Sequence, residues 1–330
     1  MDWGLILTNA LRASVGLDTV IFALAAIGLN VHFGYTGLLN FGQAAFLGVA
    51  GYGLAISVAT YDLPTVVGVV VGLAGAVVLA LLLGVPALRL RADYLAIVTL
   101  AAAEIVRLVV RASSLRRYTN GSDGLSNFSD GFYSLNPYGP GRYGIGRVSF
   151  DERQTWVLTV GWTLVVLSCL LVFLLMRSPW GRVLKAIRED EDAVRSLGKN
   201  VYSYKLQSLV LGGVLGCLGG FMTAWGNAVV QPDTFGTETT NFALTIVILG
   251  GAARVLGPVV GAVIFWTLLS LTDNILNSAR DAGYISESIL STPQVGTVRF
   301  MLVGLGLMAL AVFRPQGLFG DRREIALDAR

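Results

Sequence analysis

Residues 64–84 have the sequence PTVVGVVVGLAGAVVLALLLG, which contains no charged side chain. A helix that crosses a bilayer needs about 20 mostly apolar residues, so this run is long enough to span a membrane. The whole chain has 330 residues, of which 54% are hydrophobic and 14% are charged. Ordinary soluble domains have about 25% charged residues. We therefore predict an integral membrane protein.

Further apolar runs lie on both sides of this one and leave room for about eight to ten membrane helices. No large soluble domain fits beside them, so we expect residues 1–330 to form a single transmembrane domain. The longest run is interrupted by GGAARVLGP (250–258), which predicts two short or broken helices there. The apolar runs are 15–33, 38–59, 64–84, 94–111, 155–176, 206–225, 241–272 and 296–313.

Basic residues predict the orientation of the chain. The loop 177–205 has seven basic residues against four acidic ones and contains all three lysines. Cytoplasmic loops carry an excess of Lys and Arg, so this loop is predicted to be cytoplasmic. Counting spans outward places 89–93 and the tail 314–330 inside as well. The loop 112–153 is then an ordered extracytoplasmic cap, although it has five arginines of its own.

The topology of the first two runs is left open. The segment FGYTGLLNFGQ (33–43) is either a tight turn between two spans or a broken helix inside the membrane. The side of the N-terminus is therefore not predicted. Glycines four residues apart, such as Gly212, Gly216 and Gly220, allow close approach of helix backbones. We expect this packing within the subunit or at a subunit interface.

Several chemical signatures are missing from the sequence. It has no G-x-x-x-x-G-K-[ST] phosphate loop, no Cys/His metal cluster and no H-E-x-x-H or G-x-S-x-G motif. We therefore expect no enzyme activity, and no cofactor or metal bound by this chain. The single histidine, His32, is expected to pack at a helix end or at the membrane interface. Cys169 and Cys217 are expected to be free thiols inside apolar segments.

Two pairs of polar side chains fall inside the apolar runs and are candidates for a translocation path. Asn40 and Gln43 lie one helical turn apart, and either hold helices together or wet a passage. Glu104 and Arg107 lie three residues apart. They either neutralise each other and fix packing, or line a polar route. Both alternatives stay open for each pair.

The charged stretch RVLKAIREDEDAVRSLGK (182–199) is unusual in this apolar chain. Ser178 suits an N-cap, Pro179 the first helical position and Gly198 the position after the last turn. They predict one helix over 179–197, with an apolar stripe of Val183, Ala186, Ile187, Ala193, Val194 and Leu197.

The row of acids at 189–192 argues against a membrane-spanning or interfacial position for this helix. On the cytoplasmic side it either folds back on its own bundle or enters a groove on a partner protein. An apolar stripe flanked by both signs of charge favours the groove.

Seven blocks of the sequence, in order, resemble the M-type permease subunits of bacterial ABC importers for branched-chain amino acids. The resemblance implies an all-α polytopic bundle of the binding-protein-dependent permease family, type II-like, with a cytoplasmic coupling helix. The blocks are GYTGLLNFGQAAFLGVAGY (34–52), PALRLRADYLAIVTLAAAEIVR (86–107), TNGSDGL (119–125), SPWGRVLKAIREDEDAVRSLG (178–198), YKL (204–206), VILGGAARVLGPVVGA (247–262) and FRPQGLFG (313–320).

The resemblance implies that 178–198 docks on a separate ATPase subunit and transmits its closure to the membrane helices. The superfamily signature E-A-A-x-x-x-G corresponds here to Asp192, Ala193, Val194 and Gly198. The residues implied to take part in coupling are Gly181, Ala186, Ile187, Arg188, Glu189, Asp192, Ala193, Val194, Leu197 and Gly198.

The resemblance also implies partners in the bacterial inner membrane. These are an H-type second permease, two ATPase subunits that bind ATP and Mg²⁺, and an extracytoplasmic solute-binding protein. No nucleic acid is expected among the partners. Two alternatives are open: import of urea or short amides by the same architecture, and a stand-alone secondary transporter or channel. The few ionisable groups in the spans speak against the second.

Overall fold

The computed structural model describes residues 2–88, 92–282, 292–313 and 317–319. These residues are mostly helical, and the only strands among them are short. The elements are α1 (Trp3–Ser14), α2 (Leu17–Asn30), η1 (Val31–Tyr35), α3 (Gln43–Ala59), α4 (Thr65–Ala87), α5 (Ala92–Arg111), η2 (Ser113–Leu115), α6 (Arg116–Thr119), β1 (Leu125–Ser126), α7 (Asp130–Tyr133), β2 (Arg142–Ile145), β3 (Val148–Asp151), α8 (Glu152–Arg177), α9 (Pro179–Glu189), α10 (Glu191–Ser196), α11 (Val201–Asn227), β4 (Val229–Val230), η3 (Pro232–Phe235), α12 (Thr237–Gly250), α13 (Gly257–Asp281) and α14 (Thr292–Phe313).

Each predicted apolar run forms a helix, and the run 241–272 forms two, α12 and α13, as expected from its interruption. The all-α membrane fold class is therefore confirmed. Of the predicted cytoplasmic segments, residues 89–91, 314–316 and 320–330 lie outside the described residues. Among the described residues, the helical segments long and apolar enough to cross a membrane are Trp3–Tyr35, Thr65–Ala87, Glu152–Arg177, Val201–Asn227 and Gly257–Asp281.

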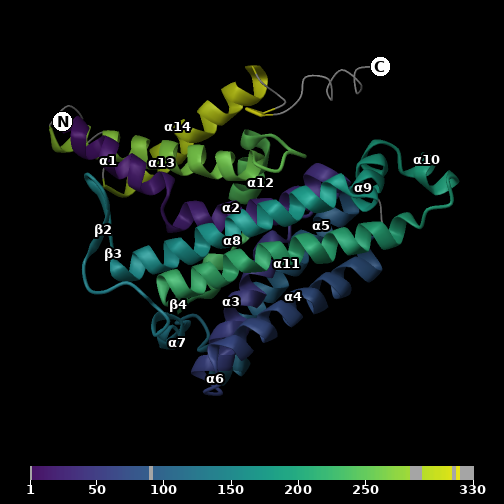
Figure 1. Cartoon of the computed structure of the whole chain (residues 1–330), viewed down its shortest axis with the longest axis horizontal. Coiled ribbons are helices and arrows are strands. Elements are labelled where there is room, and N and C mark those ends of the chain that lie inside the picture. The colour runs from purple at the N-terminus through teal and green to yellow at the C-terminus, as the bar shows by residue number, and fades with distance from the viewer. Residues whose placement is uncertain (1, 89–91, 283–291, 314–316, 320–330) are drawn as a thin grey trace.

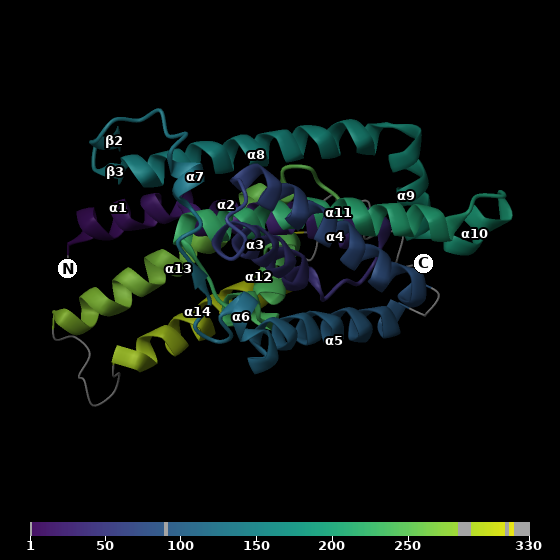
Figure 2. The same cartoon turned by 90° about the horizontal axis from the view of Figure 1, so that it is seen from below.

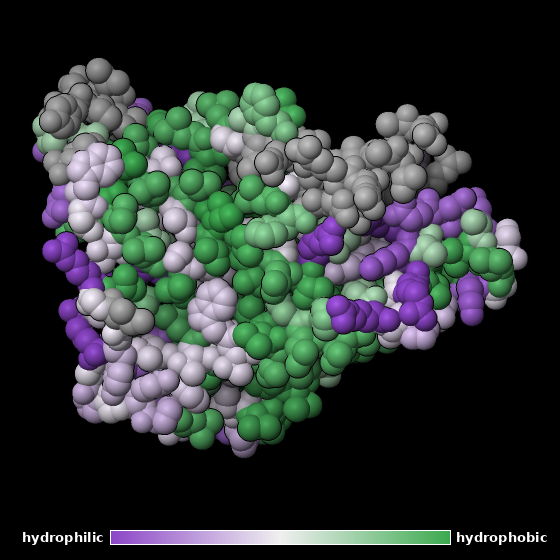
Figure 3. Space-filling view, turned by 45° about the horizontal axis from the view of Figure 1, so that its top comes forward, coloured by the Kyte–Doolittle hydropathy of each residue, from purple (hydrophilic) through white to green (hydrophobic). Residues whose placement is uncertain are grey.

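The long helices run along the long axis of the molecule, with α9 and α10 at one end and the β2–β3 hairpin at the other (Figure 1). Helix α11 is central and packs against α2, α3 and α4. Figure 2 shows α8 along one face, with α5 and α14 along the opposite face. Hydrophobic side chains gather between hydrophilic ones at the two ends (Figure 3), which is the pattern expected of a bundle that spans a bilayer.

Glycines of α11 allow the predicted close packing, and they do so within this subunit. A methyl group on Gly212 would overlap His32, and one on Gly216 would overlap Gln43. A methyl group on Gly220 would overlap the backbone of Leu47 in α3. Because these positions have no side chain, α11 approaches both α2 and α3 closely.

The segment 33–43 is a buried break in the helical path. Helix α2 continues through the π-helix η1, and α3 begins only at Gln43, after a non-helical stretch. The Gln43 side chain donates a hydrogen bond to the carbonyl of Ala25, in the middle of α2, at 3.2 Å. Helix α3 therefore starts inside the bundle. Non-helical backbone is tolerated at this depth where protein buries it, and Leu38 and Asn40 are buried here.

The loop 112–153 is ordered, as predicted. Its strand β1 pairs with β4, with Leu125 opposite Val230, and β2 pairs with β3 as a hairpin. Phe132 of α7 stacks on Trp225 at the end of α11, with ring centroids 4.4 Å apart. The loop is thus tied to the bundle on which it sits.

Candidate functional site

The stretch 178–198 forms two helices, so the single helix predicted over 179–197 is wrong. Helix α9 begins as expected, with the Ser178 hydroxyl accepting a hydrogen bond from the Gly181 N–H. Asp190 then leaves the helical conformation, with φ −154° and ψ 104°. Its carboxylate accepts the N–H groups of Asp192 and Ala193, both at 2.9 Å.

Asp190 is therefore the N-cap of a second helix, α10. Asp is among the best N-cap residues, and Glu191 and Asp192 then lie in the first turn of α10, where the helix dipole favours acids. The acids at 189–192 therefore do more than disfavour a position in lipid. They end α9 and begin α10. At the other end, Gly198 has φ +75°, a left-handed conformation that suits glycine after a helix. The predicted stop at Gly198 is confirmed.

The apolar stripe of this segment is divided between two environments. Ile187 and Val194 are 4% and 5% exposed and cluster with Val201 of α11. They fold back on the bundle, because the start of α11 supplies Val201 and Tyr204 beneath them. This differs from the predicted arrangement, in which the whole stripe enters a partner's groove. Leu197, in contrast, is 79% exposed, and Ala186 and Ala193 are also exposed.

Polar contacts hold α9 and α10 to the bundle. Glu191 forms ion pairs with Lys205 of α11 and, at 2.9 Å, with Arg195. Trp180 of α9 donates its indole N–H to Gln207 of α11 at 2.8 Å. The two short helices are thus linked to α11 on one side, while their other side is open at the end of the molecule (Figure 1).

Arg188 connects α9 to the buried break in the helical path. Its Nη1 donates to the carbonyl of Gly34, in η1, at 2.7 Å. Gly37, three residues further along the chain, lies against the aliphatic part of the same side chain. Arg188 therefore contacts the segment that leads to Asn40. No local spacing in the sequence predicts this contact, because 154 residues separate its two partners.

Asn40 and Gln43 belong to a buried hydrogen-bonded network with His32. The Asn40 amide nitrogen donates to His32 Nδ1 at 3.0 Å and to Gln43 Oε1 at 3.4 Å. His32 Nε2 lies 3.1 Å from the carbonyl oxygen of Leu209 in α11. A neutral imidazole protonated on Nε2 satisfies both contacts. This network joins the start of α3 to η1 and α11, and a role of Asn40 and Gln43 in a translocation path stays a prediction.

Glu104 and Arg107 form the predicted ion pair, and the structure extends it to η3. Arg107 Nε lies 3.0 Å from Glu104 Oε2, and its Nη1 lies 2.7 Å from Asp233 Oδ1. Arg111 reaches the same Asp233 oxygen at 3.2 Å. Asp233 was not predictable as a partner from spacing, because 126 residues separate it from Arg107 and 122 separate it from Arg111.

This charge cluster of Glu104, Arg107, Arg111 and Asp233 lies on an open face of the molecule. Its side chains are partly exposed. Exposed apolar side chains of α5 surround it, namely Ile97, Leu100, Ile105 and Leu108. Helix α5, which carries three of these four residues, lies with α14 along one face of the molecule (Figure 2).

The described residues contain no group of three or more His, Cys, Asp or Glu side chains that could hold a metal ion. Cys169 and Cys217 are buried free thiols, as expected.

Known proteins resemble this chain over most of its length. The family described as the permease component of branched-chain amino acid transport systems matches residues 12–312. The high-affinity branched-chain amino acid transport system permease protein LivM of Salmonella typhimurium is 32% identical, over 93% of this chain and 70% of that protein. LivM of Escherichia coli is 30% identical, over 91% and 68%.

A probable LivM of Methanocaldococcus jannaschii is 24% identical, over 92% of this chain and 91% of that protein. The match over residues 12–312, together with relatives at 30–32% identity, agrees with the long apolar helices of the structure. The chain belongs to the family of branched-chain amino acid transport permeases.

Proposed function

We propose that this chain is the permease subunit of an ATP-driven importer for branched-chain and other hydrophobic amino acids in a bacterial cell membrane. Two separate ATPase subunits bind ATP and Mg²⁺, and an extracytoplasmic binding protein delivers the amino acid. The family match supports the permease role. The observation that carries the coupling role is the α9–α10 segment, which is anchored to the bundle on one side and open on the other.

The surface offered to an ATPase consists of the exposed side chains of this segment. Its apolar side chains are Leu197, Ala186 and Ala193. Its charged side chains have both signs, and they include Glu189, Asp192, Arg182, Lys185, Arg195 and Lys199. Such a surface suits a groove with an apolar floor and a rim of both charges. Contacts on the inner side of the segment transmit movement of the segment to the bundle. Arg188 is hydrogen-bonded to η1, and Glu191 is ion-paired with Lys205 of α11.

The charge cluster supports a second permease on the α5 face. Glu104 lies seven residues before the end of α5, which is about 10 Å along a helix. A charged group that faces lipid at such a depth is costly, so this face is covered by protein or opens to water. We place a homologous, H-type permease against α5, with the passage for the amino acid running along the cluster.

Uptake measurements test the cargo. Cells with and without the gene receive labelled leucine or labelled urea at the same concentration. Loss of leucine uptake with unchanged urea uptake is the expected result, because the relatives at 30–32% identity are named as branched-chain amino acid permeases. Loss of urea uptake with unchanged leucine uptake would show the other cargo. If uptake of leucine and of urea is the same with and without the gene, the chain imports neither solute.

A further inference from the structure

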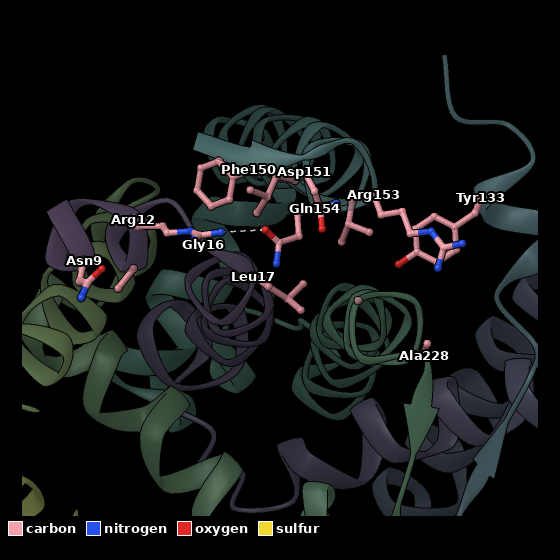
Figure 4. Close-up of a pocket in the computed structure, with 14 residues that line it drawn as sticks. Asn9, Arg12, Gly16, Leu17, Tyr133, Phe150, Asp151, Arg153, Gln154 and Ala228 are labelled. Carbon is pink, nitrogen blue, oxygen red and sulfur yellow. Dashed lines mark hydrogen bonds between the residues drawn. The ribbon is translucent and has the colours of Figure 1, made fainter. Parts of the chain in front are cut away.

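A cavity of about 670 Å³ opens at the end of the bundle that carries the β2–β3 hairpin. Its walls come from the junction of α1 and α2 at Gly16, from the start of α8 and from the end of α11 at Gly226 (Figure 4). It includes no residue of the α9–α10 segment or of the charge cluster on α5. The transport role proposed above therefore leaves it unexplained.

The cavity crosses the boundary between polar and apolar surface. Asp151, Arg153 and Gln154 line it at the start of α8, and Val157 and Leu158 line it one turn further along. Leu17 at the start of α2 adds to the apolar part. In a membrane-spanning helix, such a change from charged to apolar residues marks the level where lipid headgroups meet acyl chains.

Two arginines line the cavity on different sides: Arg12 extends toward Gln154, and Arg153 extends toward Tyr133. Figure 4 shows Arg12 and Arg153 on either side of Gln154. The Arg12 guanidinium lies over the Phe150 ring, 5.1 Å from its centroid, and donates one hydrogen bond to Gln154 at 3.0 Å. The Arg153 guanidinium lies over the Tyr133 ring at 5.4 Å. Each cation is thus positioned by an aromatic ring, which leaves its other N–H groups available.

The local charge favours an anion. Within the described ranges, neither Arg12 nor Arg153 has a carboxylate oxygen within 4.0 Å. Asp151 is the acid in the lining, and its carboxylate caps α8 by accepting the Gln154 N–H at 2.7 Å. Two arginines against one acid give the lining a net positive charge, which favours an anionic ligand.

We propose that this cavity binds an anionic phospholipid. The phosphodiester accepts hydrogen bonds from Arg12 and Arg153, and the glycerol and upper acyl groups cover the partly exposed Leu17 and Leu158. Free phosphate offers the same oxygens but nothing to cover the apolar part. The lipid would join the α1–α2 junction to α8 at the place where α2 begins. This inference does not depend on the transport role.

Lipid binding to the purified full chain tests the proposal. Native mass spectrometry in a neutral detergent counts the molecules of added phosphatidylglycerol, phosphatidylcholine or inorganic phosphate that stay bound. We expect one phosphatidylglycerol bound at least tenfold more tightly than phosphatidylcholine, and no retained phosphate. The double variant Arg12→Gln, Arg153→Gln should lose this preference. The matched control Arg116→Gln, Arg117→Gln removes the same charge from exposed arginines of α6, outside the cavity, and should keep it.

Three results would overturn the proposal. They are equal binding of the two lipids, unchanged binding by the double variant, and retention of inorganic phosphate alone. Arg153→Gln provides a second test that does not threaten folding, because Arg153 is exposed and its described contact is with the Tyr133 ring. It should weaken phosphatidylglycerol binding by itself, and unchanged binding would also count against the proposal.

Discussion

Replacing Arg188 by Met should separate ATP hydrolysis from transport. The change removes the 2.7 Å hydrogen bond from the guanidinium to the Gly34 carbonyl and keeps much of the side-chain volume. Hydrogen bonds of charged groups contribute about 1.5–3 kcal/mol. The Arg188 side chain is 26% exposed, so we take the lower end. A loss of about 1.5 kcal/mol changes an equilibrium about tenfold, so amino acid transported per ATP should fall by up to tenfold.

The assay uses the complex of permeases, ATPases and binding protein reconstituted in vesicles. Leucine uptake and phosphate release are measured in the same sample, and their ratio is compared between variants. Arg117→Met is the matched control, because Arg117 is an exposed arginine of α6, outside the α9–α10 segment. An unchanged ratio in Arg188→Met, or an equal fall in Arg117→Met, would refute transmission through η1.

Three further variants test other parts of the structure. Asp190→Ala removes the cap of α10 and should cost about 1 kcal/mol, seen as faster hydrogen exchange of the two amides that it caps; unchanged exchange would contradict the cap. Gly216→Ala should lower the melting temperature by overpacking the α11 interface, at about 1–3 kcal/mol, whereas Gly296→Ala, with open space around it, should not. Asp233→Asn should reduce leucine uptake while costing at most about 1 kcal/mol of stability; Asp123→Asn, which breaks another exposed pair, should leave uptake unchanged, and equal uptake in both variants would count against a passage along the cluster.

Local patterns predicted the helices and several of their ends. Runs of apolar residues have the same consequence wherever they occur, because backbone groups in lipid must be satisfied within the helix. Ser178 and Gly198 were also predictable, because caps depend on residues within a few positions. The same local rules could have predicted the break at Asp190, since Asp is a preferred N-cap. The apolar stripe favoured one continuous helix instead, whereas in the structure Asp190 caps a second helix.

Contacts between distant residues were not predictable from spacing. Ile187 and Val194 have the pattern of an exposed stripe, and only the position of Val201 and Tyr204 shows that they are covered. The ion pair between Arg107 and Asp233 forms only because η3 packs beside α5. The Arg188 contact with Gly34 likewise requires the end of α2 to lie beside α9. Such contacts depend on tertiary packing, which a single sequence does not display.

In the arrangement we propose, the open side of the α9–α10 segment docks on a separate ATPase. Val194→Asp is a poor test, because Val194 is 5% exposed and a charge there would disrupt the packing of α10. Leu197, at 79% exposure, tests the surface without disturbing the core. Leu135, in the loop 112–153, is 70% exposed at the opposite end of the molecule and serves as the matched control.

Photo-crosslinking of the assembled complex provides the most direct measurement. A benzophenone is attached to cysteine in Leu197→Cys or in Leu135→Cys, and the two native thiols are buried. Mass spectrometry then identifies the crosslinked protein. We predict a crosslink to an ATPase subunit from position 197 and none from position 135. An ATPase crosslink from position 135, or its absence from position 197, would contradict the account.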